Sequence, residues 1–65
     1  MNPLLTDREL QVVSAWWHTG TVKAAAEFLG LAESTVKNTL YSARHKTGHP
    51  NTLLLAKAVM GEKAA

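Results

Sequence analysis

Three residues, Ala26, Gly30 and Val36, constrain the fold of this chain more than any other feature of its sequence. Two helices that meet at a steep angle through a short turn need a small side chain where they approach each other. They also need a residue that permits the turn and a branched apolar side chain that fills the gap between them. The spacing therefore predicts a helix-turn-helix, and an ordinary corner between two helices is the alternative that it leaves open.

Capping residues and helix breakers predict where the helices begin and end. Thr6 and Glu9 have the spacing of a capping box, and Gly30 is placed to end a helix in a left-handed conformation. No alternation of β-branched residues and no hairpin turn indicates a strand. The sequence therefore predicts an all-α fold, with one domain over residues 1–60 and a flexible tail over residues 61–65. The four expected helices span about residues 7–18, 22–29, 33–46 and 52–60.

The length of 65 residues and the absence of cysteine limit how the chain can be stabilised. Without a disulfide or a thiolate metal site, a domain of this size depends on well-packed helices or on association with a copy or a partner. No apolar run reaches the length of a membrane span, and the N-terminus lacks the pattern of a signal peptide. We therefore expect a cytoplasmic location and no contact with a membrane.

The third expected helix has a narrow apolar stripe and a broad polar face. At about 100° per residue, Val36, Leu40 and Ala43 fall on one stripe. Residues 34–49 contain three lysines or arginines and no carboxylate, although the net charge of the whole chain is only +2. Such a helix either lies on the surface without a partner or presents its polar face to one. The residues outside the stripe include Ser34, Thr35, Lys37, Asn38, Tyr41 and Ser42.

Three motifs, Leu5 to Glu9, Lys23 to Ala26 and Thr35 to Lys37, are followed by Lys46 and Gly48. With these motifs the chain resembles the LuxR-type (FixJ/GerE-like) DNA-binding domain over nearly its whole length. The resemblance implies a four-helix helix-turn-helix fold whose third helix enters the major groove of double-stranded DNA. It also implies that the fourth helix contacts a second copy of the chain, which makes the protein a homodimer.

The resemblance and the side-chain chemistry together assign Lys37, Asn38 and Tyr41 to contacts with DNA bases. Lysine can donate to O6 and N7 of guanine, and asparagine can pair with N6 and N7 of adenine. Tyr41 has the alternative of binding a phosphate or packing on a sugar. The alternative for all three residues is a solvated helix face.

Five further residues are candidates for contacts with DNA phosphates. Ser34 and Thr35 stand at the start of the third expected helix, where hydroxyl groups and backbone amides suit a phosphate. Because Ala32 cannot cap that helix, capping is the alternative role of Ser34. The basic candidates, whose alternative role is only to keep exposed helices soluble, are Lys23, Arg44 and Lys46.

The apolar side of the first expected helix contains two adjacent tryptophans and one carboxylate. Val12 and Trp16 mark the centre of this side, so we expect Trp16 to lie in the core and Trp17 at its margin. Glu9 lies on the same side, where a capping box with a basic partner explains it without a catalytic role.

The fourth expected helix is apolar nearly all round. One stripe of it can cover the core, which leaves other leucines for a second surface. We expect a dimer interface that contains Leu53, Leu54 and Lys57. The alternative is that Trp17 and Leu10 cover the leucines within a single chain.

No residue pattern in the sequence indicates catalysis. His45 and His49 are separated by Gly48 and have no third ligand near them in sequence, so we expect no metal site. The chain shows no nucleophile with its base, no pair of carboxylates and no phosphate loop, so we expect no enzyme and no cofactor. The sequence predicts a small sequence-specific DNA-binding regulator of transcription, of phage or bacterial type. The alternative is a protein-binding module of the same fold that targets a host regulator or a polymerase subunit.

Overall fold

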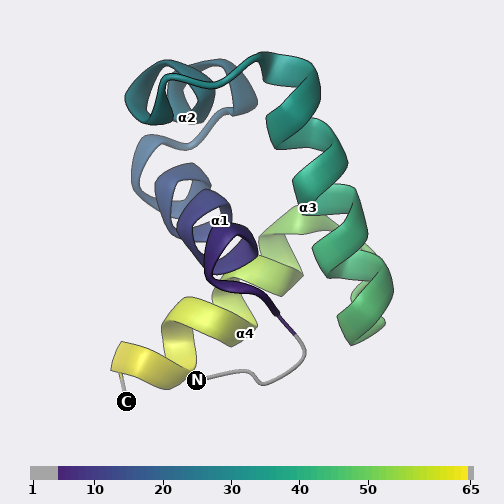
Figure 1. The fold of residues 1–65 in the computed structure, drawn as a ribbon. Helices are drawn as coiled ribbons and strands as arrows, with labels where there is room; N and C mark the ends of the chain where they lie inside the picture. The colour runs from purple at the N-terminus through teal and green to yellow at the C-terminus, as the bar shows by residue number, and fades with distance from the viewer. Residues whose placement is uncertain (1–4, 65) are drawn as a thin grey trace.

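Four helices make up the fold, which we describe from a computed structural model (Figure 1). The structure describes the backbone of residues 5–64 and the side chains of residues 5–61. No strand occurs among these residues, so the predicted all-α class with four helices is confirmed. The helices are α1 (Asp7–Thr19), α2 (Val22–Leu29), α3 (Glu33–Thr47) and α4 (Thr52–Ala64).

The first helix begins at the predicted capping box. The amide of Glu9 donates to Thr6 Oγ1 at 3.1 Å, and the amide of Thr6 donates to Glu9 Oε1 at 2.9 Å. These two bonds satisfy two of the donors that a helix start leaves unpaired. The hydroxyl of Thr21 caps the start of α2 in the same way, because the amide of Ala24 donates to Thr21 Oγ1 at 3.0 Å. Local sequence therefore sets the start of both helices.

The turn between α2 and α3 consists of residues 30–32 and depends on a glycine. Gly30 has a φ of 70°, in the left-handed region that costs other L-residues about 1–2 kcal/mol. In this conformation the amide of Leu31 donates to the carbonyl of Ala26 at 2.9 Å and closes the end of α2. Ala32 is then the N-cap of α3, and its side chain makes no capping hydrogen bond. No hydroxyl replaces this cap, so the alternative role of Ser34 as the cap is wrong.

The ends of α3 and α4 lie beyond the predicted ones. Helix α3 includes Thr47, one residue more than expected, and ends at Gly48, whose amide donates to the carbonyl of Arg44 at 2.8 Å. Helix α4 passes through Gly61 and ends at residue 64 instead of residue 60. No proline follows Gly61, and the next residue types favour helices, so a single glycine does not end this helix. The flexibility of residues 61–65 stays a prediction, and residue 65 lies outside the described residues.

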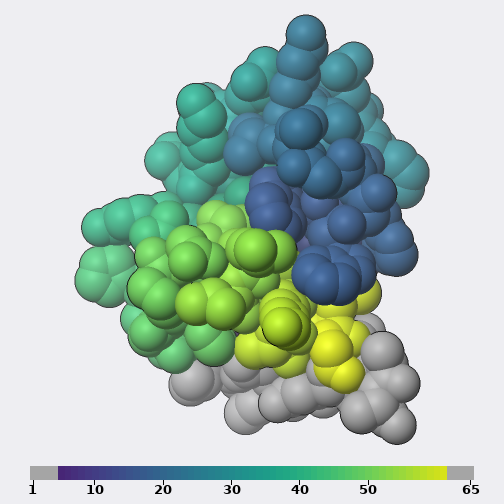
Figure 2. All heavy atoms as spheres, turned by 180° about the vertical axis from the view of Figure 1, so that it is seen from behind, coloured from purple at the N-terminus to yellow at the C-terminus, as the bar shows by residue number. Residues whose placement is uncertain are grey.

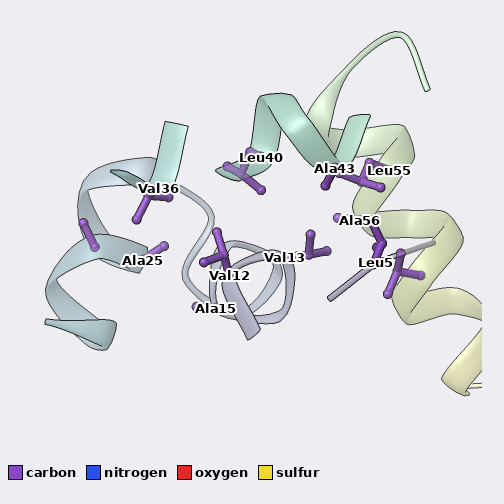
Figure 3. Close-up of a cluster of buried hydrophobic side chains, with 12 residues drawn as sticks. Leu5, Val12, Val13, Ala15, Ala25, Val36, Leu40, Ala43, Leu55 and Ala56 are labelled. Atoms are coloured by element: carbon purple, nitrogen blue, oxygen red, sulfur yellow. The ribbon is translucent and has the colours of Figure 1, made fainter. Parts of the chain in front are cut away.

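The core lies where α1 meets the other three helices, and α3 also packs against α2 and α4. Ala26 and Val36 are both buried, so the small residue of α2 and the branched residue of α3 lie where the spacing predicts them. Trp16 is partly buried and packs against the core, and Trp17 is exposed. The predicted order of the two tryptophans is confirmed, but each lies further out than predicted. Figure 3 shows side chains from all four helices that meet in this cluster. Its buried apolar residues are Leu5, Val12, Val13, Ala15, Ala25, Ala26, Val36, Leu40, Ala43, Leu55, Ala56 and Val59.

Candidate nucleic-acid interface

Helix α3 buries only one stripe and exposes the rest of its surface. Val36, Leu40 and Ala43 are buried, as the 3.6-residue period predicts. α3 lies along one side of the molecule, so its outer face is not covered by another helix (Figure 1). The exposed side chains after the first residue of the helix are those of Ser34, Thr35, Lys37, Asn38, Tyr41, His45 and Lys46.

The structure brings the three candidate base-contact residues together at one surface depression. This depression has a volume of about 310 Å³ and lies between α3 and the first residues of α2 and α4. We call it the Lys37 hollow; its lining residues are Val22, Lys37, Asn38, Leu40, Tyr41, Arg44 and Thr52. None of these residues is acidic, so the surface of the hollow can attract an anion.

Tyr41 lies between two other side chains of the same helix. Its ring meets the ring of His45 edge to face, with 5.2 Å between the centroids and 72° between the planes. The guanidinium carbon of Arg44 lies 5.9 Å from the centroid of the Tyr41 ring. Arg44 Nη2 also donates to the carbonyl of Pro50 at 3.3 Å, and its Nε is buried without a hydrogen-bond partner among the described residues. The orientation of Tyr41 is therefore restrained before any ligand binds.

His45 belongs to this group, although it is not among the predicted contact residues. The signal that could have found it is its spacing from Tyr41, because residues four apart on a helix are neighbours. With His49 it lines a second depression of about 280 Å³ at the end of α3, which we call the His49 hollow. Its lining residues are Tyr41, Arg44, His45, Gly48, His49 and Pro50.

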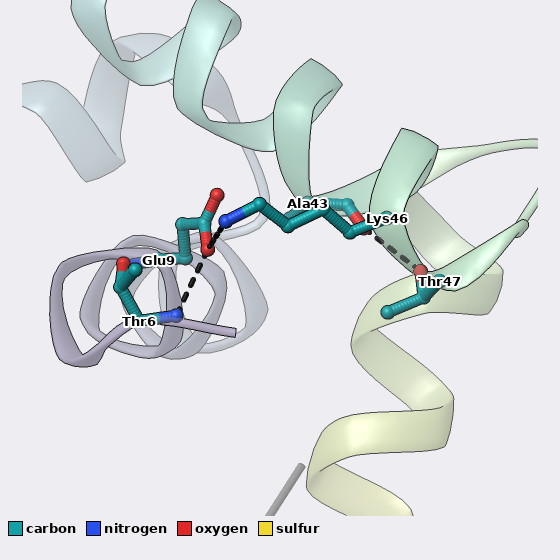
Figure 4. Close-up of polar contacts among 5 residues, drawn as sticks. All are labelled: Thr6, Glu9, Ala43, Lys46 and Thr47. Atoms are coloured by element: carbon teal, nitrogen blue, oxygen red, sulfur yellow. Dashed lines mark hydrogen bonds and ion pairs between the residues drawn. The ribbon is translucent and has the colours of Figure 1, made fainter. Parts of the chain in front are cut away.

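Lys46, a candidate phosphate contact, forms an ion pair with Glu9 of the same chain. Lys46 Nζ lies 2.8 Å from Glu9 Oε1, the same oxygen that accepts the Thr6 amide (Figure 4). The Glu9 side chain is only 8% exposed, and that burial by itself would raise its pKa. The bond and charge of Lys46, with the hydrogen bond from the Thr6 amide, outweigh burial and hold the pKa of Glu9 below its ordinary value. The phosphate contact of Lys46 stays a prediction, with Glu9 as the competing partner.

Three of the other candidate phosphate contacts are exposed at helix starts, whereas Arg44 lies half-buried in the last turn of α3. Lys23 lies in the first turn of α2, and Ser34 and Thr35 lie in the first turn of α3. Since Ala32 provides no side-chain acceptor, the first-turn amides of α3 keep their capacity to donate. Both helix starts therefore combine exposed donors with the positive end of a helix dipole.

The outer face of α4 exposes apolar side chains that no other described residue covers. Leu53 is 57% exposed and Leu54 is 43% exposed, with Lys57 exposed one turn further on. Figure 2 shows α4, in green to yellow, as part of the surface beside the second half of α1. The alternative in which Trp17 and Leu10 cover these leucines is wrong, because the leucines stay exposed in the single chain.

One exposed aromatic residue was absent from the predictions. Phe28, on α2, is 75% exposed and has no role in the core. The helical period could have found it, since Val22, Ala25, Ala26 and Leu29 take up the inner side of α2.

Comparisons with known protein-family models, with curated proteins and with solved structures find no match. Two other findings concern the described residues alone. No group of three or more His, Cys, Asp or Glu side chains there could hold a metal ion. No helix in the same part of the chain has both the length and the apolar character to cross a membrane.

Proposed function

We propose that this protein is a small sequence-specific DNA-binding regulator of transcription, with a LuxR-type helix-turn-helix formed by α2 and α3. The observation that supports this best is the outer face of α3. From Ser34 to Thr47 it exposes hydrogen-bonding and basic side chains with no carboxylate among them. A face of this kind suits the edges of bases and the phosphates beside them.

In the proposed complex, α3 lies in the major groove of double-stranded DNA. Asn38 and Tyr41 project from the helix on the side away from the buried stripe, and Lys37 lies at its flank. The amide of Asn38 has the donor and acceptor that adenine N7 and N6 require. Lys23, Ser34 and Thr35 then reach phosphates from the helix starts, and Arg44 does so from the second half of α3.

The exposed leucines of α4 support a homodimer. Leu53 and Leu54 form an apolar patch with Lys57 beside them, and burial of apolar area stabilises an interface by about 25 cal/mol per Å². Two copies related by a two-fold axis would read two inverted half-sites, which doubles the length of DNA that is read. The proposal therefore includes an operator with two half-sites and a cytoplasmic location.

A selection from random duplexes followed by titrations tests the proposal. The wild-type chain should enrich one site, and Asn38→Ala should weaken binding to that site by about 1–3 kcal/mol but change binding to random DNA little. Gln11→Ala is the matched control, because Gln11 is an exposed amide on α1. Equal losses on both DNAs would remove Asn38 from base recognition, and no enrichment at all would contradict the proposed function.

The exposed ring of Phe28 supports a second candidate function. In it, the protein is a binding module of the same fold that targets a host regulator or a polymerase subunit. An exposed aromatic side chain of this kind on α2 is typical of a protein contact. A titration against mixed DNA at two salt concentrations separates the two functions, because the binding module would show no salt-dependent affinity for DNA.

A further inference from the structure

The Lys37 hollow combines a small volume with two positively charged side chains. Its volume is about 310 Å³, and both Lys37 and Arg44 line it while no carboxylate does. We propose that this hollow is a binding site for one phosphate group, held between Lys37 and Arg44. The inference deepens the proposed function where the phosphate belongs to DNA, and it also describes a site for a free phosphorylated small molecule.

The two cations share one flank of α3 and keep their charge available. Residues seven apart on a helix lie two turns apart on the same side, so Lys37 and Arg44 approach a ligand from one direction. Among the described side chains, Lys46 and Glu9 form an ion pair. Neither Lys37 nor Arg44 has a described carboxylate within 4.0 Å. Glu33, one turn before Lys37, makes no ion pair with it.

The positions of the helix ends favour an anion in the Lys37 hollow over one in the His49 hollow. Val22 and Thr52, which line the Lys37 hollow, are the first residues of α2 and α4. The positive ends of two helix dipoles therefore lie at its rim. The His49 hollow also contains Arg44, but it lies at the end of α3, where the dipole is negative and disfavours an anion.

The arrangement of donors suits the several oxygens of a phosphate. Arg44 is restrained by the carbonyl of Pro50 and the ring of Tyr41, so it loses less side-chain freedom when it binds. Among the described residues, one guanidinium hydrogen bond is formed, from Nη2 to the Pro50 carbonyl, and Nε is buried. The remaining N–H groups on Nη1 and Nη2 can donate to a ligand. The Asn38 amide and the Tyr41 hydroxyl, in the same lining, can donate as well. In this arrangement Lys37 contacts a phosphate instead of a base, and Asn38 keeps its proposed contact with a base.

A titration of the full chain with inorganic phosphate, at constant ionic strength with chloride, tests the site. Amide chemical shifts should change at the starts of α2 and α4 and around Lys37 and Arg44. The double variant Lys37→Gln/Arg44→Gln should weaken phosphate binding by about tenfold or more, because it removes both positive charges of the hollow and their charge-assisted hydrogen bonds. Arg8→Gln, which changes an exposed cation on α1 outside the hollow, is the matched control and should leave the affinity unchanged.

Circular dichroism shows whether the double variant folds, and the single variant Lys37→Gln replaces it if Arg44 proves necessary for folding. Lys37 is exposed, so its substitution leaves the core intact. Shifts spread over every lysine and arginine, or shifts that neither variant reduces, would overturn the inference.

A second titration, with mixed-sequence duplex DNA added to the phosphate-bound protein, identifies the source of the phosphate. Displacement of inorganic phosphate by DNA means that the hollow takes a backbone phosphate. Phosphate binding without any DNA binding supports a free phosphorylated ligand and contradicts the proposed function alone. DNA binding with a salt dependence that Lys37→Gln/Arg44→Gln leaves unchanged, and without phosphate binding in the hollow, overturns the inference alone.

Discussion

The ammonium group of Lys46 lies 2.8 Å from Oε1 of Glu9, although the two residues are 37 positions apart in the sequence. The same oxygen accepts the amide of Thr6, so one carboxylate both closes the start of α1 and binds the last turn of α3. The ion pair therefore helps to fix the position of α3 relative to α1. The contact that orients the polar face of α3 therefore uses Lys46, which is itself a candidate phosphate contact.

The contribution of this pair to stability depends on pH. Because the pKa of Glu9 is lowered in the folded chain, its contribution is present above the ordinary value of 4.5 and is lost as the pH falls through the lowered value. Glu9→Gln keeps the hydrogen-bonding pattern of a capping box but removes the charge, and should cost about 1–3 kcal/mol at neutral pH.

Denaturant unfolding of wild type and Glu9→Gln from neutral pH to below pH 4.5 measures this effect. The difference between the two free energies of unfolding should shrink as the pH falls. Glu27→Gln, which changes an exposed carboxylate on α2, is the control and should show little difference at any pH. A Glu9 difference that stays constant with pH would mean that the charge of Glu9 contributes nothing.

Two glycines should respond in opposite directions to alanine. Gly30→Ala should destabilise the chain by about 1–2 kcal/mol, because its φ of 70° is unfavourable for alanine although no atom lies within 4 Å of the new Cβ. Gly61→Ala, inside α4 with the same free space, should stabilise it by about 0.5–1 kcal/mol. Thermal unfolding followed by circular dichroism compares the two. A destabilised Gly61→Ala chain would contradict the helical conformation at that position.

The salt dependence of DNA binding should separate the basic residues by their partners. If Lys23 contacts a phosphate, Lys23→Ala should lower the slope of log affinity against log salt by about one unit. Lys46→Ala should lower it by less, because Glu9 already neutralises this side chain, and should also lower the free energy of unfolding. Arg8→Ala, an exposed cation on α1, is the control and should leave the slope unchanged. Equal slopes for all three variants would mean that Lys23 faces solvent in the complex.

The proposed dimer depends on leucines that are exposed among the described residues. Leu54→Lys or Leu53→Lys should keep the helical content, yet weaken binding to an operator with two half-sites far more than to one half-site. Leu55→Lys is the contrasting variant and should unfold the chain, because Leu55 is fully buried. Ultracentrifugation with operator DNA gives the stoichiometry. One protein per operator for the wild type would contradict the dimer.

The features that could be predicted from the sequence are local. The capping box at Thr6 and Glu9 and the left-handed end of α2 at Gly30 each depend on residues within one turn. The burial of Ala26 and Val36 follows from their spacing, because α2 and α3 are consecutive helices joined by a short turn. Short-range hydrogen bonding and helical period are enough for these features.

The features that were missed need the packed molecule. The partner of Lys46 is on α1, and no local rule connects residues 46 and 9. The lining of the Lys37 hollow comes from three helices, so its residues gather only once α4 has packed against α3. The predicted α4 is too short because Gly61 was expected to end the helix. A single glycine inside a helix destabilises it by only about 1 kcal/mol relative to alanine, so α4 continues.

The absent cap at Ala32 has a consequence for the dynamics of α3. A first turn without a side-chain acceptor opens at a lower free energy than the buried turns behind it, so its amides should exchange hydrogen with solvent early. An anion bound at that turn would accept the hydrogen bonds that the alanine cannot, and would slow the exchange. Binding of an anion would then order the first turn of α3, so recognition would be coupled to a local folding step.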